Sequence, residues 1–438
     1  MTTFLIRGGR LIDPARNIDA AHDIFLRDGR VAEVEAPGKL DSLATKEHAE
    51  IISAKGLVVA PGLIDIHVHL REPGQGYKET IATGTAAAAA GGFTSVCVMP
   101  NTVPVNDSAD TTRWMQSPER GAVIRVFPIA AATRGSLGEA LTEYGALKAA
   151  GAVAVSDDGK PILQDAIMHQ SLAAAVRAGL PVIQHAEDTR MTHGASMNAG
   201  ALAFRLGLRG MSVESESSIV ERDIQLLAGL HDSRAHLHVA HLSTAKALDA
   251  VRRARRNGLR VTCEVAPHHF ALTEEAVGDY NTHAKMCPPL RAEADRVALI
   301  EGLLDGTVDA IATDHAPHAA HEKEQEFERT PNGILGLETA LGLSLKLLHQ
   351  KHNMPLSRVL SLLSAQPAQV LHLSGRGTLA VGAFADVVLF DPKEMWTYRA
   401  KASKSKSRNT PFDGWEFPGR VHLTISEGRI AYDGRTKA

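Results

Sequence analysis

The stretch Leu63-Ile64-Asp65-Ile66-His67-Val68-His69 decides the fold class. It is a short apolar run that ends in polar side chains, and an Ala-rich helical stretch follows it. The same unit recurs through the middle of the chain, with apolar runs at Leu63–Val68, Ser95–Met99, Val123–Ile129, Ala152–Val155, Pro181–Ile183, Ala235–Val239, Leu259–Val265 and Val308–Ala312. Continuous apolar runs of this length are typical of parallel strands that are buried on both faces.

Eight strand–helix units in roughly 300 residues predict a (β/α)8 barrel of the TIM type, an α/β fold. The alternative, an open doubly wound sheet, would need a Gly-rich dinucleotide loop after its first strand. In this chain the first strand is followed by His67-Val68-His69, and there is no GxGxxG motif there. We therefore expect a barrel.

Both ends of the chain lack helical periodicity and consist of short β-prone segments, so the first 55 residues are predicted to be all-β. Asp28-Gly29 is a hairpin signal, and Glu427-Gly428 is a turn between two C-terminal strands. The simplest arrangement is one small β-sandwich domain formed from both termini, residues 1–55 with 372–438, beside a barrel of residues 56–371. Two independent β appendages are the alternative.

The composition indicates an ordinary globular protein, since 44% of the 438 residues are hydrophobic and 22% are charged. The net charge of −3 gives no indication of a nucleic-acid or membrane partner. No apolar run reaches the roughly 18 residues of a membrane span, and the N-terminus has no signal-peptide pattern. Three scattered cysteines without a CxxC pair favour a reducing cytoplasm. We expect a cytoplasmic protein with a small-molecule substrate.

Imidazole and carboxylate side chains recur at nearly every predicted strand end. In a barrel these ends converge on one mouth, where active sites lie. Residues two apart on a strand point to the same face, so two imidazoles spaced like His67 and His69 can bind one ion. Four histidines and two aspartates form the candidate ligand set: His67, His69, Asp158, His185, His241 and Asp314.

These donors predict a metal site, because histidine nitrogens with carboxylate oxygens suit Zn²⁺ or a similar divalent ion. Six ligands exceed one tetrahedral shell and fit two ions per subunit that share a carboxylate. Two close ions would make a bridging hydroxide available at neutral pH. Asp314 is the candidate general base and acid, which would take a proton from this hydroxide during attack and return it to a leaving nitrogen. A role for Asp314 as a ligand only is the alternative. The implied reaction is addition of water, or its reverse, at an amide carbonyl.

The chain resembles the dihydroorotases of the long, bacterial type I group, a family of the amidohydrolase superfamily. The resemblance covers nearly the whole chain. The motifs that carry it are Gly62–Gly74, Met99–Thr102, Ser156–Gly159, Ala266–His269, Pro288–Arg291, Thr313–His318 and Asn409–Gly414.

The resemblance assigns the same six residues to the metals, and it gives Asp158 the place where relatives carry a carboxylated lysine. It also implies two Zn²⁺ ions and assigns Asp314 as the catalytic acid and base. A carboxylated Lys160 as the bridge is the alternative to Asp158. Substrate contacts are implied for His69, Arg71, Asn101, Cys287, His318, Asn332 and Gly333.

The chemistry of the side chain supports the implied role of Arg71, because a guanidinium can bind a substrate carboxylate with two hydrogen bonds. The amide of Asn101 can both donate and accept. Two positions depart from the family pattern. Cys287 stands where many relatives have Asn, so a contact there is weaker or uses the backbone. Asn332 stands where some relatives have Phe, which puts its side-chain contribution in doubt.

The activity implied by the resemblance is reversible cyclisation of N-carbamoyl-L-aspartate to (S)-dihydroorotate in de novo pyrimidine (UMP) biosynthesis. One rival is a hydantoinase, dihydropyrimidinase or allantoinase, which usually carries a bridging lysine where this chain has Asp158. Another is an inactive dihydroorotase-like partner of aspartate transcarbamoylase, which would lose metal ligands. A homodimer is the default expectation. Association of an active enzyme with aspartate transcarbamoylase remains open.

Other segments carry weaker expectations. His238 is odd-spaced from His241 and is expected to face away from the mouth and pack against a helix. His315 is expected to orient ligands from behind. The charged segment 319–331 is either a lid or plain solvated surface. The basic stretch Lys401–Arg408 is expected to be a solvated loop.

Overall fold

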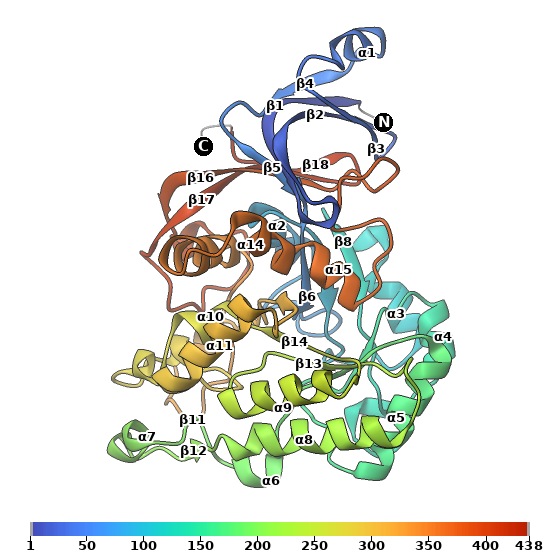
Figure 1. Ribbon diagram of the computed structural model, residues 1–438. Helices are drawn as coiled ribbons and strands as arrows, with labels where there is room; N and C mark the ends of the chain where they lie inside the picture. The colour runs from blue at the N-terminus through green and yellow to red at the C-terminus, as the bar shows by residue number, and fades with distance from the viewer. Residues whose placement is uncertain (1–2, 436–438) are drawn as a thin grey trace.

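The structure, a computed structural model that describes residues 3–435, is a barrel with a sheet packed at one end (Figure 1). This confirms the predicted fold class. Residues 1–2 and 436–438, the outermost parts of the predicted two-terminus domain, lie outside the described residues. Within residues 3–435, no helix combines the length and the apolar character that a bilayer crossing requires.

The barrel has eight short strands, each close to one of the predicted apolar runs. They are β6 (Leu63–Val68), β7 (Phe93–Val98), β8 (Arg125–Pro128), β9 (Val155–Ser156), β10 (Val182–Gln184), β13 (Leu237–Val239), β14 (Val261–Val265) and β15 (Ala310–Ile311). All pairs are parallel, in the orders β6-β7-β8 and β9-β10-β13-β14-β15. Parallel bridges between Ala130 and Val155 and between Val68 and His315 join these two runs, so the ring closes.

Helices surround the strands and cover the ends of the barrel (Figure 1). The α-helices from residue 81 onward are α2 (Ile81–Ala90), α3 (Ala109–Met115), α4 (Tyr144–Ala149), α5 (Asp165–Ala178), α6 (Thr189–Thr192), α7 (Ala201–Leu206), α8 (Glu214–Gly229), α9 (Ala245–Arg256), α10 (Pro267–Ala271), α11 (Glu293–Asp305), α12 (Ala320–Lys323), α13 (Ala340–Ser344), α14 (Leu356–Leu363) and α15 (Ala365–Val370). A π-helical segment, Leu345–Lys351, follows α13, and β11 (Met197–Asn198) pairs with β12 (Gly210–Met211) outside the barrel.

The two faces of each barrel strand enter different cores. On β13, Leu237 and Val239 pack outward in the large cluster shared with the helices. Inward-facing residues such as Cys97 and Ile183 form a second cluster, which also contains Ala368 and Leu371 of the α15 region. The α15 helix therefore closes the end of the barrel opposite the mouth. That closure leaves the carboxyl ends of the strands as the open face, where a site can form.

The two ends of the chain share a single sheet. Its strands are β1 (Phe4–Asp13), β2 (Ile18–Arg27), β3 (Arg30–Glu35), β4 (Glu50–Ser53), β5 (Val58–Pro61), β16 (Val387–Thr397), β17 (Glu416–Ser426) and β18 (Arg429–Asp433). Their order is β18-β17-β16-β5-β1-β2-β3, with β4 paired to β1. Because β5 pairs with both β1 and β16, the termini form one sheet around its own apolar core rather than two appendages. The residue limits of the domains stay a prediction.

The two turns marked by the sequence lie against each other. Asp28 and Gly29 have φ values of 51° and 74°, and Glu427 and Gly428 have 49° and 74°. Two successive positive values are those of a type I′ hairpin. A Cβ on Gly428 would lie 2.8 Å from Cα of Gly29, so the turns approach closely only because both carry glycine.

The expectation that the first 55 residues are all-β is wrong in one segment, because Asp41–Lys46 forms helix α1. The helix segment contributes Leu40 and Ala44 to a small apolar cluster with Leu5 and Phe25 of the sheet. Six helical residues carry too short a pattern to be distinguished from a turn by periodicity alone.

Candidate metal centre and active site

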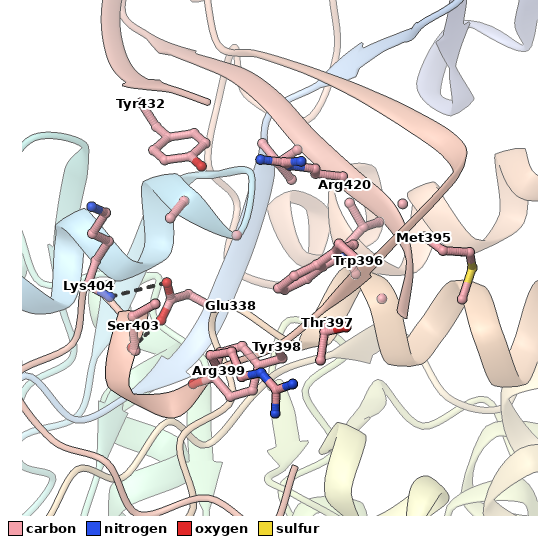
Figure 2. A pocket seen from close by; sticks show the side chains of 17 residues that line it. Glu338, Met395, Trp396, Thr397, Tyr398, Arg399, Ser403, Lys404, Arg420 and Tyr432 are labelled. Atoms are coloured by element: carbon pink, nitrogen blue, oxygen red, sulfur yellow. Dashed lines mark hydrogen bonds between the residues drawn. The ribbon is translucent and has the colours of Figure 1, made fainter. Parts of the chain in front are cut away.

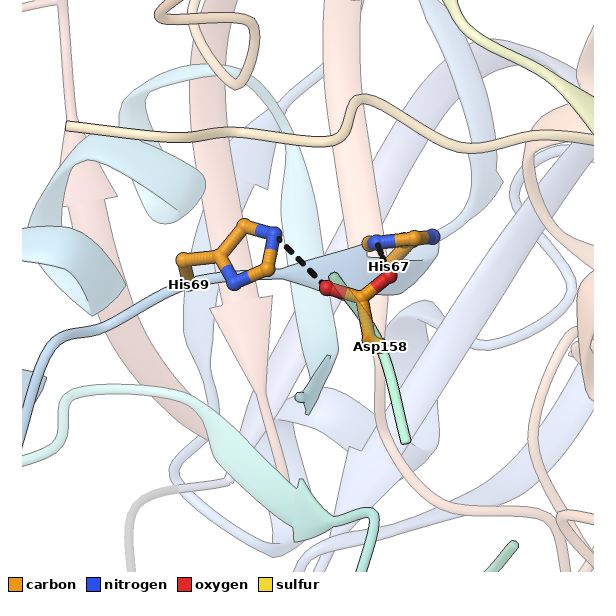
Figure 3. Close-up of side chains that lie close together, drawn as sticks. All are labelled: His67, His69 and Asp158. Carbon is orange, nitrogen blue, oxygen red and sulfur yellow. Dashed lines mark ion pairs between the residues drawn. The ribbon is translucent and has the colours of Figure 1, made fainter. Parts of the chain in front are cut away.

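The structure brings all six candidate ligands together at the carboxyl ends of the barrel strands. Figure 3 shows His67 and His69 on either side of the carboxylate of Asp158. Among the six candidates, ligand atoms that lie within 4.8 Å of one another form three overlapping groups: His67 with His69 and Asp158, His67 with His241 and Asp314, and Asp158 with His185 and His241. His67, Asp158 and His241 each belong to two of these groups, and a fourth group joins His185 with Glu187 and Cys287. That overlap is the geometry of adjoining sites with a shared carboxylate.

The cluster contains buried polar atoms that have no hydrogen-bond partner. Nε2 of His67 and Oδ1 of Asp158 are both in this state, and they lie 3.5 Å apart. Such atoms are costly to bury unless something binds them. Imidazole nitrogen and carboxylate oxygen are donors that divalent ions of the zinc type prefer, so the residues present fit the metal that the sequence predicts.

A series of buried hydrogen bonds orients the ring of His67. Oε1 of Glu264 on β14 lies 2.6 Å from Nδ1 of His67, and Oε2 lies 3.0 Å from Nε2 of His238. Nδ1 of His238 in turn lies 2.8 Å from the hydroxyl of Thr262. The prediction that His238 packs against a helix is therefore wrong, because its ring lies inside the barrel and binds the residue that orients His67.

Two further ligands are oriented in the same way. Nδ1 of His69 lies 2.9 Å from Oδ1 of Asn101, and Nε2 of His185 lies 2.9 Å from Oε2 of Glu187. In each ring, the nitrogen that faces this partner carries the proton. The other nitrogen therefore keeps a free lone pair, which faces the cluster. Asn101 also donates from Nδ2 to Oδ2 of Asp158 at 3.1 Å, so its amide links two ligands.

The charges in the cluster favour a cation between the carboxylates. Burial would raise the pKa of Asp158, but the surrounding imidazoles, His67 first among them, lower it well below its usual range. Burial likewise opposes ionisation of Asp314, and His67 and His69 outweigh it, so the pKa of Asp314 is also lowered. Burial disfavours a charge on His67, yet the carboxylates, with Asp314 foremost, raise its pKa well above the ordinary value. Both carboxylates are therefore anionic at neutral pH.

Three residues of the site have a left-handed backbone. The φ angles are 61° for Arg71, 28° for His241 and 47° for Asp314. Non-glycine residues rarely adopt positive φ, and such strain is retained where surrounding contacts hold a side chain in a needed direction. The strand ends therefore turn sharply where these side chains point into the mouth.

A cavity of about 510 Å³ opens over the cluster. Of the predicted substrate contacts, His69, Arg71, Asn101, Cys287, His318 and Asn332 line it. The seventh, Gly333, lies directly behind the cavity wall, and its N–H donates to the carbonyl of Lys285 at 2.9 Å. Arg71 is 9% exposed, donates from Nε to the carbonyl of Pro317 at 3.1 Å, and has Nη2 at 3.2 Å from Nε2 of His318.

A second cavity of similar size, about 500 Å³, lies where β16, β17 and β18 meet the barrel (Figure 2). Its walls are aromatic and basic, with Trp396, Tyr398 and Arg420 among them. None of the candidate metal ligands lines this cavity. The chemistry therefore belongs to the cavity at the barrel mouth.

Comparison with known proteins identifies the family. The Dihydro-orotase-like family model matches residues 56–247, and the Amidohydrolase family model matches residues 329–432. A dihydroorotase of Solibacter usitatus is 49% identical over 429 residues, which cover 98% of this chain and 97% of the relative. A dihydroorotase of Citrifermentans bemidjiense is 48% identical over 431 residues, 98% of this chain and 99% of the relative.

The chain belongs to the dihydroorotase family. Family membership makes it a metal-dependent cyclic amidohydrolase. Solved structures with the same fold include the dihydropyrimidinase of Brevibacillus agri, with a TM-score of 0.84 and 23% identity over 99% of this chain and 96% of that one. The L-hydantoinase of Arthrobacter aurescens has a TM-score of 0.85 and 24% identity with the same coverage. These two likenesses concern the fold alone.

Asp158 and Lys160 are the two candidates for the shared ligand. Asp158 is buried in the cluster, whereas Lys160, the alternative bridge, is exposed. Asp157, the other carboxylate of the pair, accepts the backbone N–H of Thr133 at 2.9 Å and lies outside the three ligand groups. The arrangement favours Asp158 over Lys160 as the shared ligand.

Cys287, a departure from the family pattern, lies beside a ligand. Its Sγ donates to Oε2 of Glu187 at 3.3 Å, and Glu187 holds His185. Burial, with a contribution from Glu187, raises the pKa of Cys287 to about 11, so the side chain is a neutral thiol donor. At this position the thiol contributes to the wall of the cavity and to the orientation of Glu187.

Two buried lysines hold the charged segment after β15 in place, Lys285 from outside the segment and Lys323 from within it. Nζ of Lys285 donates to the carbonyls of Phe327 at 2.6 Å and Thr330 at 2.7 Å. Nζ of Lys323 donates to the carbonyl of Pro331 at 2.9 Å. The segment is therefore more than plain solvated surface, and its action as a lid stays a prediction.

The sequence did not single out the carboxylates that orient the ligands, Glu264 and Glu187. Glu264 had a visible signal, because it is a charged residue inside the predicted buried strand Leu259–Val265. Glu187 is two residues beyond His185, and nothing in the sequence shows which ring nitrogen of His185 it hydrogen-bonds.

His315 is the residue expected to orient ligands from behind. Its backbone carbonyl accepts the N–H of His69 at 2.9 Å, while Nε2 of its ring lies 3.4 Å from Oε2 of Glu79.

Proposed function

We propose that the chain interconverts N-carbamoyl-L-aspartate and (S)-dihydroorotate, a step of de novo pyrimidine biosynthesis. One observation carries the choice of substrate. Arg71 is buried and lines the same cavity as His69 and Asp314. Dihydroorotate combines a cyclic amide with a carboxylate, whereas hydantoin and dihydrouracil are uncharged rings. A buried guanidinium favours the charged ring, because it needs an anionic partner.

The six clustered residues are proposed to hold two Zn²⁺ ions, with Asp158 shared between them. His67 and His69 would hold one ion, His185 and His241 would hold the other, and Asp314 would complete the set; their ligand atoms are grouped closely enough for this. When bound, such ions polarise the reacting carbonyl and lower the pKa of the attacking water. Glu264, Asn101 and Glu187 keep the imidazoles turned toward the ions.

Asp314 is proposed to carry the proton. Its Oδ1 lies 3.0 Å from Nε2 of His69, and the side chain lines the cavity. In the hydrolytic direction, its carboxylate accepts the proton of the attacking water and delivers it to the ring nitrogen as the C–N bond breaks. In cyclisation the carboxylate takes a proton from the carbamoyl nitrogen as that nitrogen attacks the side-chain carboxyl carbon, and it returns the proton to the hydroxide that departs as the C–O bond breaks, so that water leaves.

Arg71 and Asn101 are proposed to hold the exocyclic carboxylate of the substrate. The guanidinium supplies a positive charge and two parallel hydrogen-bond donors. The side-chain amide of Asn101 lines the same cavity and hydrogen-bonds His69. His318, Asn332 and Gly333 lie beside Arg71 at the cavity, where Nε2 of His318 is 3.2 Å from Nη2 of Arg71 and 2.8 Å from the carbonyl of Asn332. The thiol of Cys287 is proposed as a minor contact.

A paired assay tests the substrate. Purified protein is given dihydroorotate, hydantoin and dihydrouracil in parallel, with and without a chelator. We expect turnover of dihydroorotate alone, and its loss with the chelator. Turnover only of the uncharged rings would contradict the proposal and favour a hydantoinase or dihydropyrimidinase. Absence of both turnover and bound metal would favour an inactive partner of aspartate transcarbamoylase.

The assembly and location of the protein are further proposals. A homodimer, association with aspartate transcarbamoylase and a cytoplasmic location follow from the family resemblance and from the scattered cysteines. Sedimentation of the purified chain, alone and mixed with the transcarbamoylase, tests the first two. A single monomeric species in both samples would contradict them.

A further inference from the structure

A segment near the C-terminus reaches the mouth of the barrel. We call Ser403–Thr410 the strap; it leaves the terminal sheet after β16 and returns to it before β17. Its serines face inward: Ser403 donates a hydrogen bond to the partly buried Glu338 (Figure 2), and the hydroxyl of Ser407 donates to the carbonyl of Lys78 at 2.7 Å. The expectation of a solvated loop for Lys401–Arg408 holds for its exposed basic residues and is wrong for its serines.

Asn409, near the end of the strap, forms hydrogen bonds through both the oxygen and the nitrogen of its side-chain amide. The side chain is 1% exposed. Its Oδ1 accepts the backbone N–H of His318 at 2.9 Å, and its Nδ2 donates to the carbonyls of Ala316 at 2.9 Å and Gly333 at 3.0 Å. Its own carbonyl accepts the N–H of Leu335 at 3.0 Å. One buried amide therefore joins the segment after β15 to the segment 333–335.

These two segments carry groups of the proposed substrate pocket. Arg71 rests on the first segment through the carbonyl of Pro317 and the ring of His318. Nε2 of that ring also hydrogen-bonds the carbonyl of Asn332, the residue before Gly333. The position of the guanidinium therefore depends on the spacing that Asn409 sets.

The contact between the segments leaves no room for adjustment. Gly333 has a φ of 153°, and a Cβ built on it would lie 2.5 Å from the carbonyl oxygen of Ala316 and 2.7 Å from Cδ2 of His318. Backbones packed this closely shift together if a bridging hydrogen bond is lost. Displacements of about 1 Å at groups that hold a substrate weaken binding or catalysis strongly.

We propose that Asn409 is a positioning residue for substrate binding, which sets the place of Arg71 and His318 from the C-terminal part of the chain. The inference rests on the proposed function, because that function assigns Arg71 to the substrate carboxylate and His318 to the wall of the same cavity. Asn409 touches none of the six clustered ligands in the structure. Its loss therefore changes the affinity for substrate and leaves the metal sites intact.

Steady-state kinetics of Asn409→Ala on dihydroorotate tests the proposal. We expect KM to rise by about tenfold or more, since loss of the buried amide leaves the N–H of His318 and the carbonyl of Ala316 without the partner that Asn409 supplies and weakens the bonding of the Gly333 carbonyl. We expect kcat to stay within about threefold, because binding is affected more than the proton transfer. The metal content should equal that of the unmodified protein. The matched control is Ser407→Ala, a buried strap residue whose hydroxyl donates to the carbonyl of Lys78, and for this variant KM should stay within about twofold.

Two results would overturn the proposal. One is a folded Asn409→Ala protein whose KM is unchanged. The other is a fall of kcat and metal content with KM unchanged, which would assign Asn409 to the metal centre. Should Asn409→Ala not fold, Asn409→Ser keeps a smaller polar group, and the same comparison of KM with kcat applies. An unmodified protein that does not turn over dihydroorotate contradicts the proposed function itself, so the two failures are distinguishable.

Discussion

Oε1 of Glu264 lies 2.6 Å from Nδ1 of His67, on the side of the ring that faces away from Asp158. The carboxylate accepts the Nδ1 proton and leaves Nε2 free toward the cluster, so it fixes the tautomer that an ion requires. The same oxygen accepts the backbone N–H of His241 at 3.3 Å. One buried carboxylate thus positions two of the proposed ligands, which come from different strands.

Replacing Glu264 with Gln is expected to weaken metal binding by about 10- to 100-fold, because the amide has a weaker acceptor for the Nδ1 proton. Competition with a chelator of known affinity measures the change. Asp386→Asn, which removes a buried carboxylate in the terminal sheet region, is the control and should keep the affinity of the unmodified protein. An unchanged affinity in Glu264→Gln would show that His67 needs no such partner.

Asp314→Asn is expected to lower kcat by about 10² to 10⁴, the range that a positioned acid–base group contributes. The asparagine keeps the shape of the side chain but cannot accept and release the proton. Metal content has to be measured on the same sample, since Asp314 is also a proposed ligand. Near-normal kcat with both ions present would contradict the proton-transfer role.

Arg71→Lys is expected to raise KM for dihydroorotate by about tenfold or more and to change kcat much less, because an ammonium group cannot form two parallel hydrogen bonds with a carboxylate. The variant retains the positive charge, so the comparison separates geometry from charge. Initial rates over a range of substrate concentrations give both constants. A KM equal to that of the unmodified protein would mean that another residue holds the carboxylate.

Arg376→Ala is expected to destabilise the fold by about 3–5 kcal/mol, since it removes one partner of a buried ion pair. The Arg376 side chain is 4% exposed and pairs with Asp386, which is 3% exposed, and with Glu427. These residues connect the end of the barrel to the terminal sheet. Urea unfolding followed by circular dichroism measures the loss, with the exposed pair variant Arg113→Ala as the control. Equal midpoints for both variants would contradict the account of this contact.

Much of the fold and of the ligand set follows from local patterns. Apolar runs separated by helical stretches predict all eight barrel strands, and the two-residue spacing of His67 and His69 places both rings on one side of a strand. Because the ends of the strands converge on one mouth of a barrel, the remaining candidate ligands are predicted to lie beside these two rings. None of this needs information about contacts between distant residues.

The residues that orient the site were harder to predict, because their roles depend on contacts across the fold. His238 has the spacing of an outward residue relative to His241, but β13 ends between the two, so strand alternation does not extend to His241. Asn409 belongs to a recognisable motif, yet the partners of its side chain lie 76 and more residues away in sequence. Helix α1 is too short for its periodicity to be read.

Reconstitution tests the central claim most directly. Protein stripped of metal with a chelator is titrated with Zn²⁺ while hydrolysis of dihydroorotate is followed. Because six clustered ligands are proposed to hold two ions, we expect no activity in the stripped protein and full recovery as two equivalents are bound. Full activity without metal, or binding of two equivalents without any recovery of dihydroorotate hydrolysis, would contradict the account.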